Sequence, residues 1–126
     1  MDPMNAAHKE LAAGRWRTLS FAEQMANIGS EISRTIIWKN KSNPVHRDRA
    51  FERALELLRL TIDDPANRTR PRLKELTRTR EALIDHFLCR NSYKTTDECW
   101  NRYFLQFAYA ANLKRRGRGE ILSSAL

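Results

Sequence analysis

The sequence predicts an all-α protein, an up-and-down antiparallel four-helix bundle with a basic flexible C-terminal tail. Three observations support this prediction. Four segments repeat apolar residues every three or four positions, the spacing of one helix face, and no segment alternates like a strand. Short connections favour antiparallel neighbours. The 126 residues fit one compact domain. We divide the chain into an N-terminal arm (1–19), a bundle domain (20–113) and the tail (114–126).

The first predicted helix begins after Ser20 and runs to about Trp38. Ser20 and Glu23 form a capping-box pair, in which each side chain accepts a backbone N–H of the other residue. The apolar stripe that follows consists of Phe21, Met25, Ile28, Ile32 and Ile36. Gly29 lies beside this stripe among other small residues, and because glycine is a poor helix former, we expect a second helix to approach closely there. A short helix is also expected around residues 5–13.

The second predicted helix starts at Asn43 and Pro44, a cap followed by a proline in the first helical position. Its apolar arc comprises Ala50, Phe51, Ala54, Leu55, Leu57, Leu58 and Ile62, with charged residues on the opposite side. The helix is expected to end at Asp63 and Asp64, because Pro65 disfavours helical geometry in the residue before it.

The third and fourth predicted helices carry less regular stripes. The third begins near Pro71, and its stripe reads Leu73, Leu76, Arg80, Leu83 and Phe87, so that one arginine interrupts the apolar residues. The fourth starts with a second capping box, Thr95 and Glu98. Its core face is rich in aromatic residues: Trp100, Tyr103, Phe104 and Phe107, with Ala108 and Ala111. Clustered bases and two glycines predict that residues 114–126 form a mobile tail.

The positive charge is concentrated at the start of the third predicted helix. The chain has 23 Lys plus Arg against 15 Asp plus Glu. The residues predicted to contact phosphates are Arg68, Arg70, Arg72, Lys74 and Arg78, with Arg115 and Arg116 of the tail as auxiliaries. A helix N-terminus already attracts anions, whereas bases there oppose the helix dipole, so an acidic partner would stabilise the cluster. The alternative is that these bases are solvated or paired with acids of the second helix.

Several functional classes find no support in the sequence. His8, His46 and His86 lie on three separate segments, and there is neither a Cys-x2-Cys nor a Glu-x-x-His pair, so no metal site is predicted. No glycine-rich phosphate loop is present, and no cofactor is expected. The chain has no apolar run of membrane-spanning length and no apolar signal core. We therefore expect a soluble cytoplasmic protein, with no membrane partner, in which Cys89 and Cys99 are reduced thiols.

Arg80 is the anomaly of the third stripe. An arginine at such a position can extend to the edge of the bundle, pair with a buried acid, or point into a groove or subunit interface where an anion binds. The sequence leaves these three explanations open.

The stretch from Arg80 to His86 resembles the Arg-x4-6-His signature of the HEPN superfamily, small helical-bundle proteins that often accompany nucleotidyltransferases or act as RNases. Residues 27–31 (Asn-Ile-Gly-Ser-Glu) are similar to an Ile-Gly-containing helix of its short toxin-like members. The resemblance implies a metal-independent RNase, in which Arg80 stabilises charge on the scissile phosphate and His86 acts as acid or base. The sequence departs from the most similar family version at Asp85, which stands where the histidine is expected, and at Glu81, whose charge repels a phosphate.

The sequence therefore leaves three functional hypotheses. The first is a non-enzymatic helical-bundle module that binds nucleic acid or an acidic partner protein through a basic face. The second is a HEPN-type RNase; because Arg80 and His86 lie about 120° apart on a regular helix, they can share a site only if the helix ends early or a second subunit contributes, and we expect a dimer. The third is a structural subunit of a helical complex, and a homo-oligomer is possible in each case. We favour the first hypothesis and expect no RNA cleavage.

Overall fold

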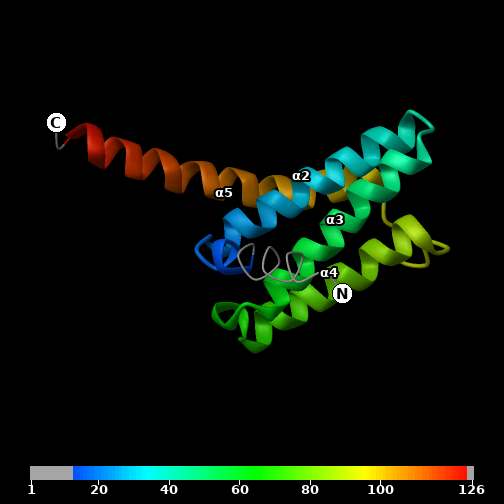
Figure 1. The fold of residues 1–126 in the computed structure, drawn as a ribbon, viewed down its shortest axis with the longest axis horizontal. Coiled ribbons are helices and arrows are strands. Elements are labelled where there is room, and N and C mark those ends of the chain that lie inside the picture. Colours follow the sequence, from blue (N-terminus) through cyan, green and yellow to red (C-terminus); the bar gives the residue numbers. More distant parts are fainter. Residues whose placement is uncertain (1–12, 125–126) are drawn as a thin grey trace, which may run out of the picture.

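Four long helices make up most of the computed structural model, which describes residues 13–124, with side chains for residues 13–117. A helical turn at 13–16 precedes α2 (Phe21–Asn40), α3 (Pro44–Asp63), α4 (Arg70–Leu88) and α5 (Asp97–Ser124), and the short 3₁₀ helix η1 (Pro65–Asn67) joins α3 to α4 (Figure 1). No residue of the described range belongs to a strand, so the predicted all-α class is confirmed. Residues 5–12, where a short helix was expected to begin, lie outside this range.

The first two long helices begin at their predicted caps, and α2 ends at Asn40, two residues beyond the predicted end near Trp38. Ser20 Oγ accepts the N–H of Glu23 at 3.2 Å, and Glu23 Oε1 accepts the N–H of Ser20 at 3.2 Å, which completes the capping box. Asn43 Oδ1 caps α3 by accepting the N–H of His46 at 3.1 Å. Helix α3 then ends at Asp63, before the proline that was predicted to end it.

The start of α5 differs from its prediction by one residue. Thr96, not Thr95, caps the helix, because its Oγ1 accepts the N–H of Cys99 at 3.1 Å. Thr95 lies in the preceding loop, where its hydroxyl accepts the indole N–H of Trp100 at 3.1 Å. Both threonines carry a hydroxyl that can cap a helix. Because the hydroxyl of Thr95 is bonded to Trp100, Thr96 provides the cap.

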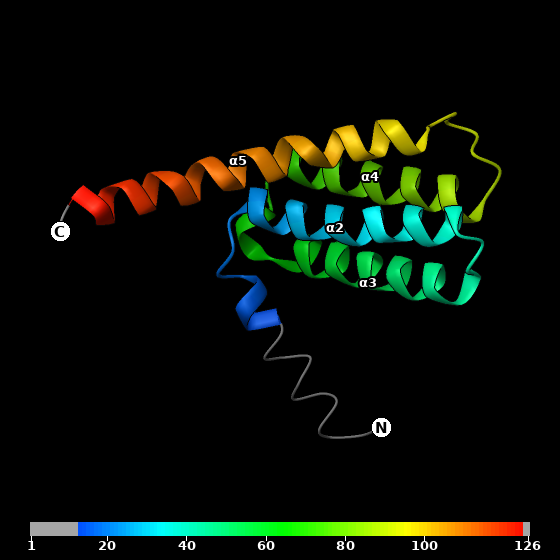
Figure 2. The ribbon, with the colours of Figure 1, turned by 90° about the horizontal axis from the view of Figure 1, so that it is seen from above.

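The segment predicted as a flexible tail continues α5 as a helix to Ser124. Leucine, lysine and arginine are good helix formers, and extension of an existing helix avoids the cost of nucleation. These effects offset the roughly 1 kcal/mol that Gly117 and Gly119 each cost within a helix. The helix therefore does not end at the boundary predicted at residue 113, and its C-terminal part projects beyond the other helices (Figure 2).

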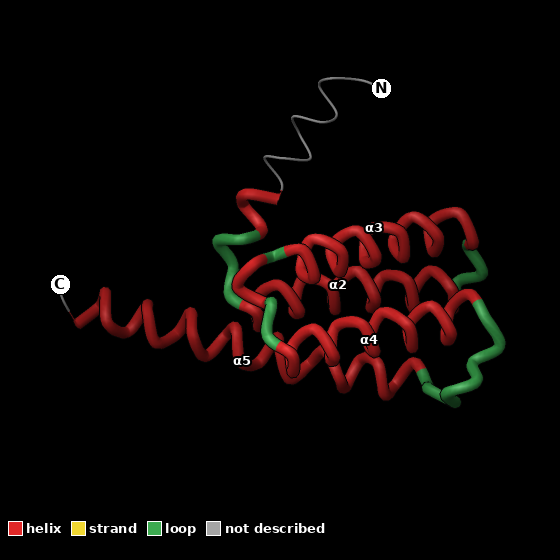
Figure 3. The backbone as a smooth tube through the Cα atoms, turned by 90° about the horizontal axis from the view of Figure 1, so that it is seen from below, coloured by secondary structure: helices red, strands yellow, loops and turns green. Residues whose placement is uncertain are grey.

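Helix α2 makes the most extensive contacts among the long helices. It packs against α3 and against α5, and α3 also packs against α4 (Figures 2 and 3). The colours in Figure 2 show that successive long helices run in opposite directions. The buried side chains of the core include Met25, Ile28, Ile32, Phe51, Leu58, Leu76, Leu83, Trp100 and Phe104. All four predicted apolar stripes contribute to this core.

Gly29 allows α2 and α5 to approach closely. A Cβ added at Gly29 would lie 2.5 Å from Phe104 Cβ and 2.9 Å from Phe104 Cγ. Because the Cβ position is fixed by the backbone of α5, that helix would have to move to make room. The close helix approach predicted from Gly29 is confirmed.

Trp16 lies in the predicted N-terminal arm but belongs to the core. Its indole N–H donates to Thr61 Oγ1 at 2.9 Å, and its carbonyl accepts from Gln24 Nε2 at 3.0 Å. Gln24 Nε2 also donates to Asp64 Oδ2 at 2.8 Å, and Asn67 Nδ2 donates to Gln24 Oε1 at 2.9 Å. All these polar side chains are buried and satisfied. The network ties the segment before α2 to the corner between α3 and α4, so the folded unit begins before residue 20.

Candidate functional site

Three of the predicted phosphate-binding residues form a row on one exposed face of α4. Arg70, Lys74 and Arg78 follow one another at intervals of four residues, so they lie about 6 Å apart along the helix axis. All three are exposed, and none of them forms an ion pair with the side chains that the structure describes. We call these residues the basic row. Of the two predicted alternatives, pairing with acids of α3 does not occur for them, whereas exposure to solvent does.

Glu75, the acid within this part of α4, does not neutralise the basic row. The hydroxyl of Tyr103 on α5 donates to Glu75 Oε1 at 2.8 Å, and Thr79 Oγ1 lies 3.1 Å from the same hydroxyl. Burial raises the pKa of Tyr103 well above its ordinary value, the bond with Thr79 opposes this rise, and the carboxylate of Glu75 adds to it. Tyr103 therefore remains a proton donor, and Glu75 is engaged in the contact between α4 and α5.

Arg72 differs from the basic row because its side chain is partly buried in contacts with the protein. Its Nη1 donates to Asn67 Oδ1 at 3.3 Å and to the carbonyl of Ala66 at 3.4 Å. Its guanidinium carbon lies 4.7 Å from the ring centroid of Phe21, which is the geometry of a cation–π contact. These contacts hold η1 and the start of α2 against α4, so the structure gives Arg72 a structural role.

The fold brings two basic segments that are distant in sequence to one end of the molecule. Helix α4 begins at the end from which α5 projects (Figures 2 and 3). Arg68 is exposed just before α4, and Lys114, Arg115 and Arg116 are exposed on α5. The set that we call the basic end consists of Arg68, Arg70, Lys74, Lys114, Arg115 and Arg116, together with Arg78, which continues the basic row to the middle of α4.

Arg80 does not lie on the buried stripe of α4, contrary to the prediction. The buried positions of α4 are Leu76, Thr79 and Leu83, and Arg80 is exposed. It borders an open depression next to α3 that also contains Glu52 and Glu56, but no carboxylate of the described side chains lies within 4 Å of its guanidinium. Three explanations for Arg80 were left open by the sequence. The structure agrees with the first of them, in which the side chain extends to the edge of the bundle.

His86 is held in a polar cluster between α4 and α5. Its side chain is only 8% exposed. Its Nε2 lies 2.8 Å from Asp97 Oδ1, and its Nδ1 lies 3.0 Å from Thr95 Oγ1. Lys39 Nζ of α2 donates to the same Asp97 oxygen at 2.6 Å. Burial alone would raise the pKa of Asp97, but hydrogen bonds and charge from Lys39 and His86 outweigh burial and lower this pKa.

The structure does not bring Arg80 and His86 together within one chain. Six residues of helix separate them by about 9 Å along the axis and turn them about 120° apart. Arg80 borders α3, whereas His86 contacts Asp97 at the start of α5. Asp85, which stands where the family pattern expects a histidine, accepts the backbone N–H groups of Ser92 at 2.9 Å and Tyr93 at 3.0 Å. Asp85 thus stabilises the loop after α4.

The sequence did not reveal the partners of His86. Lys39, Thr95 and Asp97 come from a helix end, a loop and a helix start, so no spacing pattern connects them. An acid in the first turn of a helix is already explained by the helix dipole, and Asp97 therefore gave no separate signal.

The described part of the chain lacks two further features. No group of three or more His, Cys, Asp or Glu side chains in this part of the chain is arranged to hold a metal ion. None of the described helices is long and apolar enough to span a membrane. Compared with known proteins, the chain matches no family model, no curated protein and no solved structure.

Proposed function

We propose that this protein is a non-enzymatic helical module that binds nucleic acid through phosphate contacts at the basic end. The observation that carries this proposal is the basic row: Arg70, Lys74 and Arg78 share one exposed helix face and have no carboxylate of the described side chains within 4 Å. Evenly spaced, unpaired bases suit a ligand with regularly repeated negative charge. Lys114, Arg115 and Arg116 extend the positive surface from a second helix.

The basic row is unfavourable in the protein alone. Like charges four residues apart on a helix cost about 0.2–0.5 kcal/mol per pair. Bases in the first turn of a helix also oppose the positive end of its dipole. Bound phosphates would relieve both effects, which supports a polyanion as the partner.

The surroundings of the basic row favour nucleic acid over an acidic protein. Interfaces between proteins have an apolar centre, whereas phosphate contacts do not need one. The large exposed apolar residues of the described chain are Ile37, Val45, Leu88, Tyr93, Leu105, Tyr109 and Leu113, and none of them lies between Arg68 and Arg78. Residues 68–78 themselves supply no exposed aromatic side chain that could stack on a base, so we expect binding to depend on the phosphate backbone and not on sequence.

The fold is consistent with this role. We infer that α2, α3, α4 and α5 form an up-and-down four-helix bundle, supported by the alternating directions of the helices and by the short connections between them. The HEPN resemblance stays a prediction. The distance between Arg80 and His86 within one chain favours a binding or accessory member over an RNase, and a structural subunit of a helical complex remains the third hypothesis.

The test is the salt dependence of binding to a duplex of arbitrary sequence. Replacing Arg70, Lys74 and Arg78 together by serine should reduce the slope of log affinity against log salt by about one unit for each lost contact. Arg72 is left intact because of its structural contacts. The matched control replaces Arg49, Arg90 and Arg102, which are exposed, unpaired with described side chains and outside the basic end.

Both triple variants lose the same net charge, so only the position of the bases differs. A smaller slope in the first variant alone supports the proposal, whereas equal slopes in both variants, or no binding by the unaltered protein, would overturn it. The same preparations are incubated with single-stranded and structured RNA, where we expect no cleavage. Cleavage that is lost in both Arg80→Ala and His86→Ala, with the fold of each intact, would establish the nuclease instead.

A further inference from the structure

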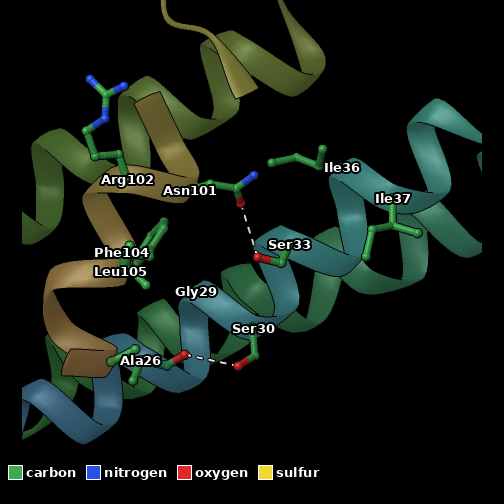
Figure 4. Close-up of a pocket in the computed structure, with 11 residues that line it drawn as sticks. Ala26, Gly29, Ser30, Ser33, Ile36, Ile37, Asn101, Arg102, Phe104 and Leu105 are labelled. Atoms are coloured by element: carbon green, nitrogen blue, oxygen red, sulfur yellow. Dashed lines mark hydrogen bonds between the residues drawn. The ribbon is translucent and has the colours of Figure 1, made fainter. Parts of the chain in front are cut away.

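A groove runs between α2 and α5 on the outer side of the molecule (Figure 4). Its α2 side includes the small residues Ala26, Ser30 and Ser33 as well as two isoleucines, and its α5 side includes Leu105. The serine hydroxyls are already bonded within the protein: Ser30 donates to the carbonyl of Ala26 at 3.2 Å, and Ser33 donates to Asn101 Oδ1 at 3.1 Å. The groove therefore offers apolar surface and few unsatisfied polar groups to a ligand.

Large apolar side chains border this groove and lie open to solvent. Ile37 on α2 is 49% exposed, and Leu105 on α5 is 65% exposed. Tyr109 and Leu113 continue the exposed stripe along α5 at successive intervals of four residues. A contiguous apolar surface that stays exposed on a folded protein marks an interaction site.

The shape of the groove suits a helix. From Ala26 to Ile37 it follows α2 for about three turns, roughly 17 Å. Lining residues recur every three or four positions on both helices, which is the pattern of a seam into which a third helix packs.

The charge at the groove selects the kind of helix. Arg102 is the one charged residue among the described residues that line it, and it is exposed without an ion pair to any described side chain. A second copy of the chain is a poor occupant, because the apolar stripe of its α5 is flanked by Arg102 and Arg116. If the two α5 helices paired, the arginines of one copy would lie next to the arginines of the other. Like charges across an interface oppose association.

We propose that this groove binds an amphipathic helix of a partner protein, which places its apolar face in the groove and a carboxylate against Arg102. None of the residues that line the groove belongs to the basic end, so this proposal does not depend on nucleic-acid binding.

The probe is a labelled, end-capped helical peptide of roughly 18 residues, long enough to populate a helix, with leucine on one face and glutamate on the other. A second peptide has lysine in place of each glutamate, and a third is a scrambled form of the first. Binding is measured by fluorescence anisotropy with the full chain that carries serine at positions 70, 74 and 78, so that the basic row cannot attract the glutamates.

Two variants of exposed residues test the location. Leu105→Glu should weaken binding of the glutamate peptide by about tenfold or more, whereas Leu88→Glu, at an equally exposed leucine on α4, should leave it unchanged. Arg102→Glu should reverse the preference between the glutamate and lysine peptides. Circular dichroism verifies that each variant is folded.

Saturable binding of the glutamate peptide, with these effects of the variants, supports the proposal. Four outcomes would overturn it: no saturable binding, equal binding of the scrambled peptide, insensitivity to Leu105→Glu, or insensitivity to Arg102→Glu. Sedimentation of the protein alone tests whether a second copy occupies the groove. A dimer that Leu105→Glu abolishes would show that it does, and this result would overturn the proposal.

Discussion

Asp97 joins three helices through one carboxylate oxygen. Lys39 reaches it from α2 at 2.6 Å and His86 reaches it from α4 at 2.8 Å, while Asp97 itself begins α5. The charge of this side chain therefore contributes to how the end of α4 is held against the start of α5. The lowered pKa of Asp97 shows that the ionised form is the one stabilised in the folded protein.

This shift predicts how stability depends on pH. A carboxyl whose pKa is lower in the folded than in the unfolded state contributes stability above its unfolded pKa of about 3.9, and this contribution is lost as pH falls through the folded pKa. Asp97→Asn should therefore reduce the free energy of unfolding by about 1 kcal/mol at pH 7, because the amide keeps an acceptor but loses the charge. The difference from the unaltered protein should shrink below about pH 4.

Urea unfolding at several pH values measures this difference. Asp48→Asn is the matched control, since Asp48 is exposed and its ion pair is with the adjacent Arg47. A difference for Asp97→Asn that stays constant from pH 7 to about pH 3 would show that the charge of this residue contributes nothing.

At the residue scale, the sequence predicts chemistry better than contacts. It identified the bases of the basic row, and their common face follows from helical periodicity. It also predicted that Arg80 and His86 face different directions. It could not show that Arg72 lies over Phe21, because these residues meet only when α2 and α4 are in place. For the same reason it placed Arg80 among core residues, whereas Thr79 is the buried side chain.

At the element scale, the contact between α2 and α5 depends on Gly29. Replacing Gly29 by alanine should gain about 1 kcal/mol in helix propensity, but the added methyl group would overlap Phe104 Cβ. Overpacking of this kind typically costs about 1–3 kcal/mol, so we expect a net loss of stability. Gly117→Ala is the control, because a Cβ there meets no atom within 4 Å, and it should stabilise α5. Thermal melts of both variants provide the measurement, and an equal gain for the two would show that α5 shifts at no cost.

Helix boundaries were predicted wherever a local signal determines them. The capping box at Ser20 and the break before Pro65 depend on neighbouring residues alone, and both occur in the structure. The start and end of α5 were less predictable. Its start depends on the contact between Thr95 and Trp100, and its extension past residue 113 depends on the length of helix already formed.

At the scale of the whole molecule, the assembly joins parts that the sequence treated as separate. Trp16 of the predicted arm is packed in the same core cluster as residues of all four long helices. The apolar stripes predict that the helices bury one face each, but they do not say which helices are neighbours. That arrangement determines that α4 begins where α5 projects, and so determines that the two basic segments share one end.

A single cluster of buried residues predicts cooperative unfolding of the entire domain. Leu58 is fully buried in this cluster, so Leu58→Ala should lower the free energy of unfolding by about 2–5 kcal/mol. Leu88→Ala, at a leucine that is 61% exposed, should change it by about 0.5 kcal/mol or less.

The three tryptophans, Trp16, Trp38 and Trp100, report on the segment before α2, the end of α2 and the start of α5. Unfolding followed by their fluorescence and by far-UV circular dichroism should therefore give coincident main transitions, shifted together by Leu58→Ala. Separate transitions, or a shift in only one probe, would mean that α5 or the segment around Trp16 unfolds independently of the core that contains Leu58.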